Sequence, residues 1–246
     1  MGGILEQSLG FENDFSRHAR AVKFSLGMQA VTIGFVIYLF ISVLSSGNDE
    51  EGFGAEVVLI LFGILAGFVL LISHLAFTFS LMKFGTYRKS FKTLAVLGCV
   101  ACILPLTGFF TFMINMMAEV TLKIVVALVI ALIIFSVRPV YYLLMRSEIA
   151  ARVNEKQAAH WRNLILIDII FILCGVTAFA LLIKSGHSHS DPGYDSLVML
   201  TEVSGIVAGI AFAARLVYEF ICTSQTEKKL FESYNGKEVL PIYVQN

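Results

Sequence analysis

Long apolar stretches separated by short polar segments dominate the pattern of this chain. An α-helix rises about 1.5 Å per residue, so about 20 consecutive apolar residues cross the hydrocarbon layer of a bilayer. Lipid offers no partner for backbone N–H and C=O groups, so each such segment must be helical inside a membrane. Six segments meet the required length. The predicted spans cover residues 25–46, 55–82, 92–116, 118–145, 163–184 and 196–222.

The charged residues between these spans indicate their orientation. Lys and Arg gather before residue 25, in the loop at 83–92, in the connection at 142–162 and after residue 222, whereas the other loops carry mainly Asp and Glu. Basic residues mark the cytoplasmic side of a membrane. All four basic segments fall on one side of a six-span arrangement. We therefore expect an all-α polytopic bundle of about six transmembrane helices with both termini in the cytoplasm (N-in/C-in).

No linker interrupts the apolar part of the chain, which predicts a single transmembrane domain at residues 25–222. Residues 1–24 are expected to form a cytoplasmic amphipathic segment, and residues 223–246 a cytoplasmic tail. The amphipathic segment is predicted as a short helix in the membrane interface, with an unstructured tail as the alternative. Its apolar positions at helical spacing are Ile4, Phe11, Phe15 and Val22.

The connection at 142–162 is rich in strong helix formers. It predicts that the fourth span continues into the cytoplasm as a helix, kinked or restarted near Pro139.

Composition agrees with a membrane protein. Apolar residues make up 57% of the 246 and charged residues 15%, against about 45–50% and about 25% in soluble domains. The 18 acidic and 18 basic residues balance, so no excess charge indicates a nucleic-acid partner. The four cysteines lie within or at the edges of apolar runs, which implies no disulfide framework.

Ionisable residues inside the predicted spans are candidate functional residues. Each costs at least about 2.5–3.5 kcal/mol at the centre of a membrane helix, so these side chains are expected to face the bundle interior. Asp168 stands between two apolar runs at the depth of Arg215 and Arg138, and we expect it to pair with one of them. The charge-layer candidates are His74, Arg138, Asp168 and Arg215 toward the cytoplasm, with Glu56, Lys123 and Glu202 toward the outside.

Two interpretations of these residues remain open. In one, His74, Asp168 and Glu202 form a proton or cation path, in which the imidazole changes charge near neutral pH. In the other, the pairs Asp168–Arg215 and Lys123–Glu202 fix the order of the helices. The structural interpretation is preferred because buried charges of opposite sign pair in either case.

Two short patterns recur along the chain. The motif F-x-x-R-x-V-Y ends the fourth and the sixth span, at residues 135–141 and 212–218. It is typical of repeated helical hairpins in transporters or, as we prefer, of Arg and Tyr anchors at helix ends. The pattern G-x-x-x-G predicts close helix packing in the second and sixth spans. Its glycines are Gly63, Gly67, Gly205 and Gly209.

The external loop after the fifth span holds His187, His189 and Asp191. In an extended strand these residues would share one face, a set that suits zinc or copper. A fourth ligand is missing nearby, so a solvated polar loop is preferred and no metal is expected. The sequence contains no P-loop, H-E-x-x-H or Rossmann glycine pattern. We therefore expect neither an enzyme nor a bound cofactor.

Two functional hypotheses follow. The preferred one is a non-catalytic integral subunit of a larger membrane assembly, such as a secretion or energy-converting machine of the bacterial inner (plasma) membrane. Its partners would be the lipid bilayer and other membrane subunits or a second copy of the chain. The alternative is a small proton or cation channel or carrier that uses Asp168, His74 and Glu202. The first is preferred because the first and third spans carry almost no ionisable residues.

Overall fold

The computed structural model describes residues 2–45, 52–114, 120–187 and 194–238. Over these ranges the chain is all-helical, with six α-helices and one short 3₁₀ helix. The helices are α1 (Gly2–Ser45), α2 (Gly52–Leu81), η1 (Met82–Thr86), α3 (Lys89–Ile114), α4 (Val120–Arg152), α5 (Glu155–His187) and α6 (Tyr194–Glu238). Side chains are described at residues 10–35, 37–38, 65, 68–103, 136–178, 180–181 and 195–232.

Three helical segments among the described residues are long and apolar enough to cross a membrane. They are Phe68–Thr86, Glu155–Ala178 and Asp195–Glu232. They overlap the second, fifth and sixth spans predicted from the sequence. The described residues therefore support a helical membrane protein.

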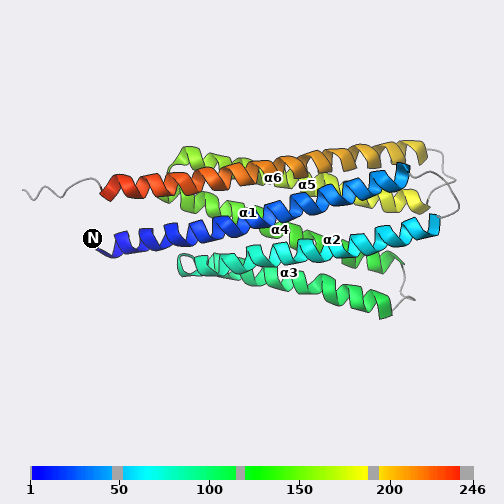
Figure 1. The fold of residues 1–246 in the computed structure, drawn as a ribbon, viewed down its shortest axis with the longest axis horizontal. Helices are drawn as coiled ribbons and strands as arrows, with labels where there is room; N and C mark the ends of the chain where they lie inside the picture. Colours follow the sequence, from blue (N-terminus) through cyan, green and yellow to red (C-terminus); the bar gives the residue numbers. More distant parts are fainter. Residues whose placement is uncertain (1, 46–51, 115–119, 188–193, 239–246) are drawn as a thin grey trace, which may run out of the picture. The chain divides into compact units, whose positions relative to one another are not determined.

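The described helices belong to two compact units, Met1–Cys102 (unit 1) and Ile103–Asn246 (unit 2). The division falls within α3, where the sequence has no linker. In unit 1, α1 packs along α2 and both helices contact η1. In unit 2, α5 packs against α4 on one side and α6 on another, and Figure 1 shows α5 and α6 running side by side.

Several helices are longer than the spans predicted from the sequence. Residues 2–45 form one continuous helix, so the boundary expected at residue 24 lies inside α1. Likewise α6 continues to Glu238, beyond the expected start of the tail at residue 223. The fourth span does continue as a helix to Arg152, and it runs through Pro139 without a restart, which was one of the two predicted alternatives.

Unit 1 is held together by a seam with coiled-coil spacing. Besides Ala19 and Leu26, the buried positions of α1 alternate in steps of four and three residues, which keeps one side of the helix against its neighbour. These positions are Phe11, Phe15, His18, Val22, Ser25, Gln29 and Thr32. The predicted helical spacing of Phe11, Phe15 and Val22 is thus confirmed, and the face they share is buried against α2 and η1.

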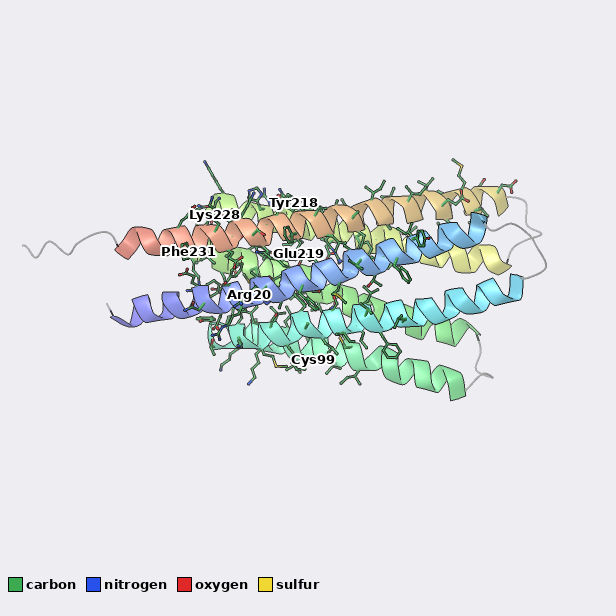
Figure 2. All side chains as sticks on the ribbon, in the orientation of Figure 1. Arg20, Cys99, Tyr218, Glu219, Lys228 and Phe231 are labelled. Atoms are coloured by element: carbon green, nitrogen blue, oxygen red, sulfur yellow. The ribbon has the colours of Figure 1, made fainter. Side chains whose placement is uncertain are left out.

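Unit 2 has a comparable row of buried residues along α6, and most of those toward the C-terminal end of the helix are polar. Its buried residues are Ala208, Ala211, Arg215, Glu219, Cys222, Thr223, Thr226 and Leu230. Figure 2 shows the side chains along this helix, with Tyr218, Glu219, Lys228 and Phe231 labelled. Burial of charged and hydroxyl groups is costly unless each finds a partner. The partners supplied by α4 and α5 define the candidate site.

Candidate functional site

Five polar side chains from three helices meet inside unit 2. Arg138 and Tyr142 lie one turn apart on α4, Arg215 and Glu219 lie one turn apart on α6, and Asp168 comes from α5. Residues four apart share a helix face, so each pair projects to the same side of its helix. All five are nearly or fully buried, with at most 4% of any residue exposed. We call this set the charge cluster.

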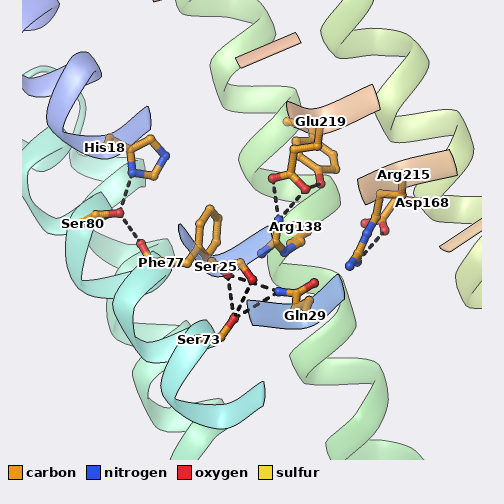
Figure 3. Close-up of polar contacts among 11 residues, drawn as sticks. His18, Ser25, Gln29, Ser73, Phe77, Ser80, Arg138, Asp168, Arg215 and Glu219 are labelled. Carbon is orange, nitrogen blue, oxygen red and sulfur yellow. Dashed lines mark hydrogen bonds and ion pairs between the residues drawn. The ribbon is translucent and has the colours of Figure 1, made fainter. Parts of the chain in front are cut away.

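Glu219 is the acceptor that joins α4 to α6 (Figure 3). Arg138 Nη1 lies 2.5 Å from both carboxylate oxygens of Glu219. The hydroxyl of Tyr142 donates a hydrogen bond of 2.7 Å to Glu219 Oε2. Hydrogen bonds to an ionised partner are stronger than neutral ones. Both donors on this turn of α4 therefore bind the same carboxylate.

The second ion pair joins α5 to α6. Arg215 Nη1 donates to Asp168 Oδ1 at 3.3 Å. The guanidinium also lies 4.5 Å from the ring centroid of Phe212 and 5.4 Å from that of Phe171, distances at which a cation is attracted to an aromatic face. None of the described residues donates a hydrogen bond to Asp168 Oδ2. The Arg215–Asp168 pair is longer than the Arg138–Glu219 pair. It also leaves Asp168 Oδ2 without a donor among the described residues.

The charge cluster is electrically balanced, because it contains two arginines and two carboxylates. An isolated charge in a medium of low dielectric constant is very unfavourable, and removal of one partner from a buried pair destabilises a protein by about 3–5 kcal/mol. The balance explains how unit 2 accommodates four charges at positions that the solvent barely reaches. The two ion pairs of the cluster therefore connect α4 and α5 to α6.

Toward the C-terminal end of α6, neutral hydrogen bonds extend this seam. Thr226 Oγ1 accepts from Gln157 Nε2 at 2.9 Å and from Trp161 Nε1 at 3.1 Å. Two turns earlier on α6, Tyr218 OH lies 2.7 Å from His160 Nδ1. Trp161 is fully buried and also contacts the ring of Tyr141 edge-on, with centroids 5.7 Å apart. The three helices are thus connected by polar contacts from the charge cluster to Thr226.

Unit 1 contains a separate, uncharged polar seam. Ser25 Oγ and Ser73 Oγ are 2.8 Å apart, and Gln29 Nε2 donates to both hydroxyls at 3.2 and 3.3 Å. Two turns along α1 from Ser25, His18 Nδ1 lies 2.6 Å from Ser80 Oγ. These contacts set the register between α1 and α2, because each polar group finds its partner at one alignment only. Figure 3 shows them on adjacent helices.

The structure bears on several residues that the sequence singles out. The predicted pairing of Asp168 is present, with Arg215 as the partner, while Arg138 binds Glu219 instead. His74 is 9% exposed in unit 1, where its backbone carbonyl accepts from Thr78 Oγ1 at 3.1 Å.

Glu202, expected to face the interior, is exposed on α6. It precedes the buried Ala208 by six positions, and at about 100° per residue this offset turns it roughly 120° away from the seam. Gly205 and Gly209 lie beyond it on α6, and within unit 2 no atom lies within 4 Å of a Cβ built on either one. The close packing predicted for these two glycines is therefore not made by α4 or α5.

The remaining predicted positions lie outside the described residues or side chains. The side chains of Glu56, Lys123 and His187 and the surroundings of Gly63 and Gly67 are not described, and His189 and Asp191 fall between α5 and α6. Among the residues that are described, no three His, Cys, Asp or Glu side chains form a metal-binding group.

The sequence reasoning missed Glu219 and Tyr142. A signal for both was present, since Glu219 follows Arg215 by four residues and Tyr142 follows Arg138 by four. That spacing places two polar groups on one helix face. Both residues also directly follow the F-x-x-R-x-V-Y motif, at equivalent positions after its two copies, and they hydrogen-bond to each other.

Comparison of the chain with protein-family models, with curated proteins and with solved structures finds no match. Function is therefore argued from the residues and their geometry alone.

Proposed function

We propose that this protein is a non-catalytic integral subunit of a larger assembly in the bacterial inner (plasma) membrane, such as a secretion or energy-converting machine. In this proposal the chain crosses the membrane six times with both termini in the cytoplasm. The charge cluster holds α4, α5 and α6 together, and an uncovered face of α6 binds another membrane helix.

The exposed faces of unit 2 support the membrane location. On α5, exposed Arg162 and Asn163 are followed by exposed Leu166 and Ile169. On α6, which runs the other way, exposed apolar residues up to Ile221 are followed by exposed Gln225 and Lys228. Asn163 Nδ2 lies 3.4 Å from Tyr218 OH, so the two changes occur at neighbouring heights. A shared boundary between apolar and polar surface is expected where a bundle leaves the hydrocarbon layer.

The main support for a role as a subunit is a face of α6 that neither α4 nor α5 covers. Glu202 is exposed there among apolar side chains, with Ile206 62% and Ile210 65% exposed in unit 2. A carboxylate facing lipid is expensive, which favours a protein partner over lipid at this position. Gly205 and Gly209 leave the backbone open to close approach, the arrangement in which membrane helices gain dispersion contacts. We call Glu202, Gly205, Ile206 and Gly209 the α6 face.

One observation favours a second candidate, a small proton or cation carrier. Asp168 is 1% exposed, and none of the described residues donates a hydrogen bond to its Oδ2. A buried carboxylate with an open oxygen is able to bind a proton. The subunit is preferred because Asp168 and Glu219 are each paired with an arginine, and pairs of buried opposite charges hold membrane helices together without any transported ion.

The α6 face is tested by substitutions that place bulky side chains at its two glycines. Gly205→Leu with Gly209→Leu adds bulk where unit 2 offers no clash, so the chain should fold as before. Ala214→Leu is the matched control, because Ala214 is also exposed on α6 but lies on a different side. Native electrophoresis of membranes solubilised in mild detergent should show the wild type and the control in a large complex and the glycine variant outside it. Migration of all three as single chains of equal stability would contradict the proposal.

The carrier is tested separately by ion flux into liposomes containing the purified chain. The subunit proposal predicts no flux above that of empty liposomes. Flux in the wild type that disappears in Asp168→Asn, with unchanged thermal stability, would favour the carrier.

Topology is tested by labelling single cysteines introduced at Ser188 and Ser224 with a reagent that does not cross membranes. The proposed orientation requires labelling from outside at residue 188 only. Labelling from outside at residue 224 only would invert it.

A further inference from the structure

Basic residues gather at one end of unit 1, around the turn that joins α2 to α3. Three come from α1, one from η1, and three from the turn and the start of α3. They are Arg17, Arg20, Lys23, Lys83, Arg88, Lys89 and Lys92, and we call them the basic surface. All except the half-buried Lys23 are exposed, and Arg20 is labelled in Figure 2.

The turn that presents this surface is firmly packed. Phe84 of η1 is fully buried and contacts the rings of Phe11 and His18, with centroids 5.4 and 5.1 Å apart. Tyr87 OH donates to Asp14 Oδ2 at 3.0 Å, which fastens the turn to α1. The basic residues of η1 and α3 are therefore held beside those of α1 before any ligand arrives, and preorganisation of this kind reduces the cost of binding.

A Cβ on Gly85 would lie 2.8 Å from Lys92 Cβ. The turn is therefore close enough to α3 that only glycine fits without a shift. This close approach places the start of α3, with Lys89 and Lys92, beside η1.

The surroundings of this surface are strongly positive. Among the described side chains of unit 1, the acidic residues are Glu12 and Asp14, against the seven basic residues of the surface. The Asp14 carboxylate already accepts the hydrogen bond from Tyr87. The surface therefore attracts anions, and the attraction should weaken as salt is added.

Apolar residues border the basic surface on the side where a bilayer is expected. The exposed side of α1 changes from Arg17 and Arg20 to Phe24, which is 57% exposed, and then to Val31, which is 72% exposed. Lys83 follows Met82, which is 38% exposed. Six residues of helix from Arg17 to Lys23 cover about 9 Å, similar to the depth of one headgroup layer.

From these contacts we infer that the basic surface of unit 1 binds the phosphate groups of anionic phospholipids in the leaflet that it faces. The ligand is a membrane lipid because apolar side chains that fit acyl chains lie directly beside the basic residues that fit phosphate. Juxtamembrane clusters of this size attract anionic lipid headgroups. The inference rests on the proposed membrane location and adds a specific lipid class to it.

The test uses the full-length protein in a neutral detergent, titrated with phosphatidylglycerol or with phosphatidylcholine. Native mass spectrometry counts the bound lipids, and thermal unfolding reports stabilisation. Phosphatidylglycerol should bind and raise the Tm, and phosphatidylcholine should bind at least tenfold more weakly. The variant Lys83→Gln/Lys89→Gln/Lys92→Gln should lose most of this preference while unfolding at the wild-type Tm without lipid, because these side chains are exposed.

The control Lys228→Gln/Lys229→Gln removes two basic residues of α6 and should keep the preference. A second variant, Tyr87→Phe, keeps every charge but removes the hydrogen bond to Asp14. It should weaken binding of phosphatidylglycerol a few-fold, because the turn then holds the basic residues less firmly beside α1. Equal loss of preference in the α6 control would overturn the assignment to unit 1.

Inorganic phosphate provides the remaining comparison. If phosphate at millimolar concentration raises the Tm as much as phosphatidylglycerol does, the surface binds free phosphate and the lipid inference is wrong. Failure of the protein to insert into liposomes would instead contradict the proposed membrane location. Insertion with equal binding of the two lipids would overturn only this inference.

Discussion

Arg138 of α4 and Glu219 of α6 form a buried ion pair in which one guanidinium nitrogen lies 2.5 Å from both carboxylate oxygens. The two residues are 81 positions apart in the sequence. Both are almost inaccessible to solvent, at 3% and 0% exposure. Because neither charge is stable alone in such surroundings, the pair makes the position of α6 depend on that of α4. The other contacts of the charge cluster then decide how costly each change to it should be.

Replacement of Glu219 by glutamine should be the most destabilising change in the cluster. It keeps the size of the side chain but leaves Arg138 buried without a counter-charge, at an expected cost of about 3–5 kcal/mol. Glu232→Gln is the matched control, because Glu232 is exposed and its pair with Lys228 is loose at 3.7 Å. Thermal unfolding in detergent measures both. An equal Tm for the two variants would contradict the role assigned to Glu219.

Asp168→Asn should also destabilise the protein, because it leaves Arg215 without its partner. The expected loss approaches 3–5 kcal/mol and is reduced by the aromatic rings of Phe171 and Phe212 beside the guanidinium. The double variant Asp168→Asn/Arg215→Gln should recover much of this loss, since no lone charge remains. A double-mutant cycle on unfolding free energies measures the coupling. Strictly additive losses would show that the two residues do not act as a pair.

Two buried threonines on α6 provide a matched comparison of satisfied and unsatisfied hydroxyls. Both are fully buried, but Thr226 Oγ1 accepts two hydrogen bonds, whereas Thr223 Oγ1 has no partner among the described residues. Thr226→Val should cost about 1–3 kcal/mol, because it deprives the buried donors of Trp161 and Gln157 of an acceptor. Thr223→Val removes an unsatisfied group and should be neutral or stabilising. Equal losses in chemical unfolding would refute this assignment.

Ser73→Ala tests the uncharged seam of unit 1. The substitution removes the hydroxyl that Ser25 and Gln29 both contact, and the loss of these buried hydrogen bonds should cost about 1 kcal/mol, because Gln29 keeps its bond to Ser25. Ser90→Ala is the control, because Ser90 is exposed at the start of α3. Hydrogen exchange in α1 and α2 should increase for Ser73→Ala and remain unchanged in α5 and α6. A uniform increase along the chain would show that the seam is not local to unit 1.

The charge cluster shows how far site prediction from sequence extends. A carboxylate in the middle of an apolar run requires a cation, so the pairing of Asp168 was predictable to within two candidates. The choice of Arg215 over Arg138 was not, because it depends on Glu219 occupying Arg138. Glu219 was overlooked because it stands near the end of a predicted span, where a charged residue is ordinary.

The sequence alone determined that the chain is helical, with segments long and apolar enough to cross a membrane, because such segments have no other regular structure in lipid. It also located the buried acid on α5. Only the tertiary structure decided the partners, the unbroken lengths of α1 and α6, and the exposure of Glu202. The physical reason is that span length and hydropathy are local properties of one segment. Pairing and exposure depend on the rotation of each helix about its axis, which is set by the packing of all its neighbours at once.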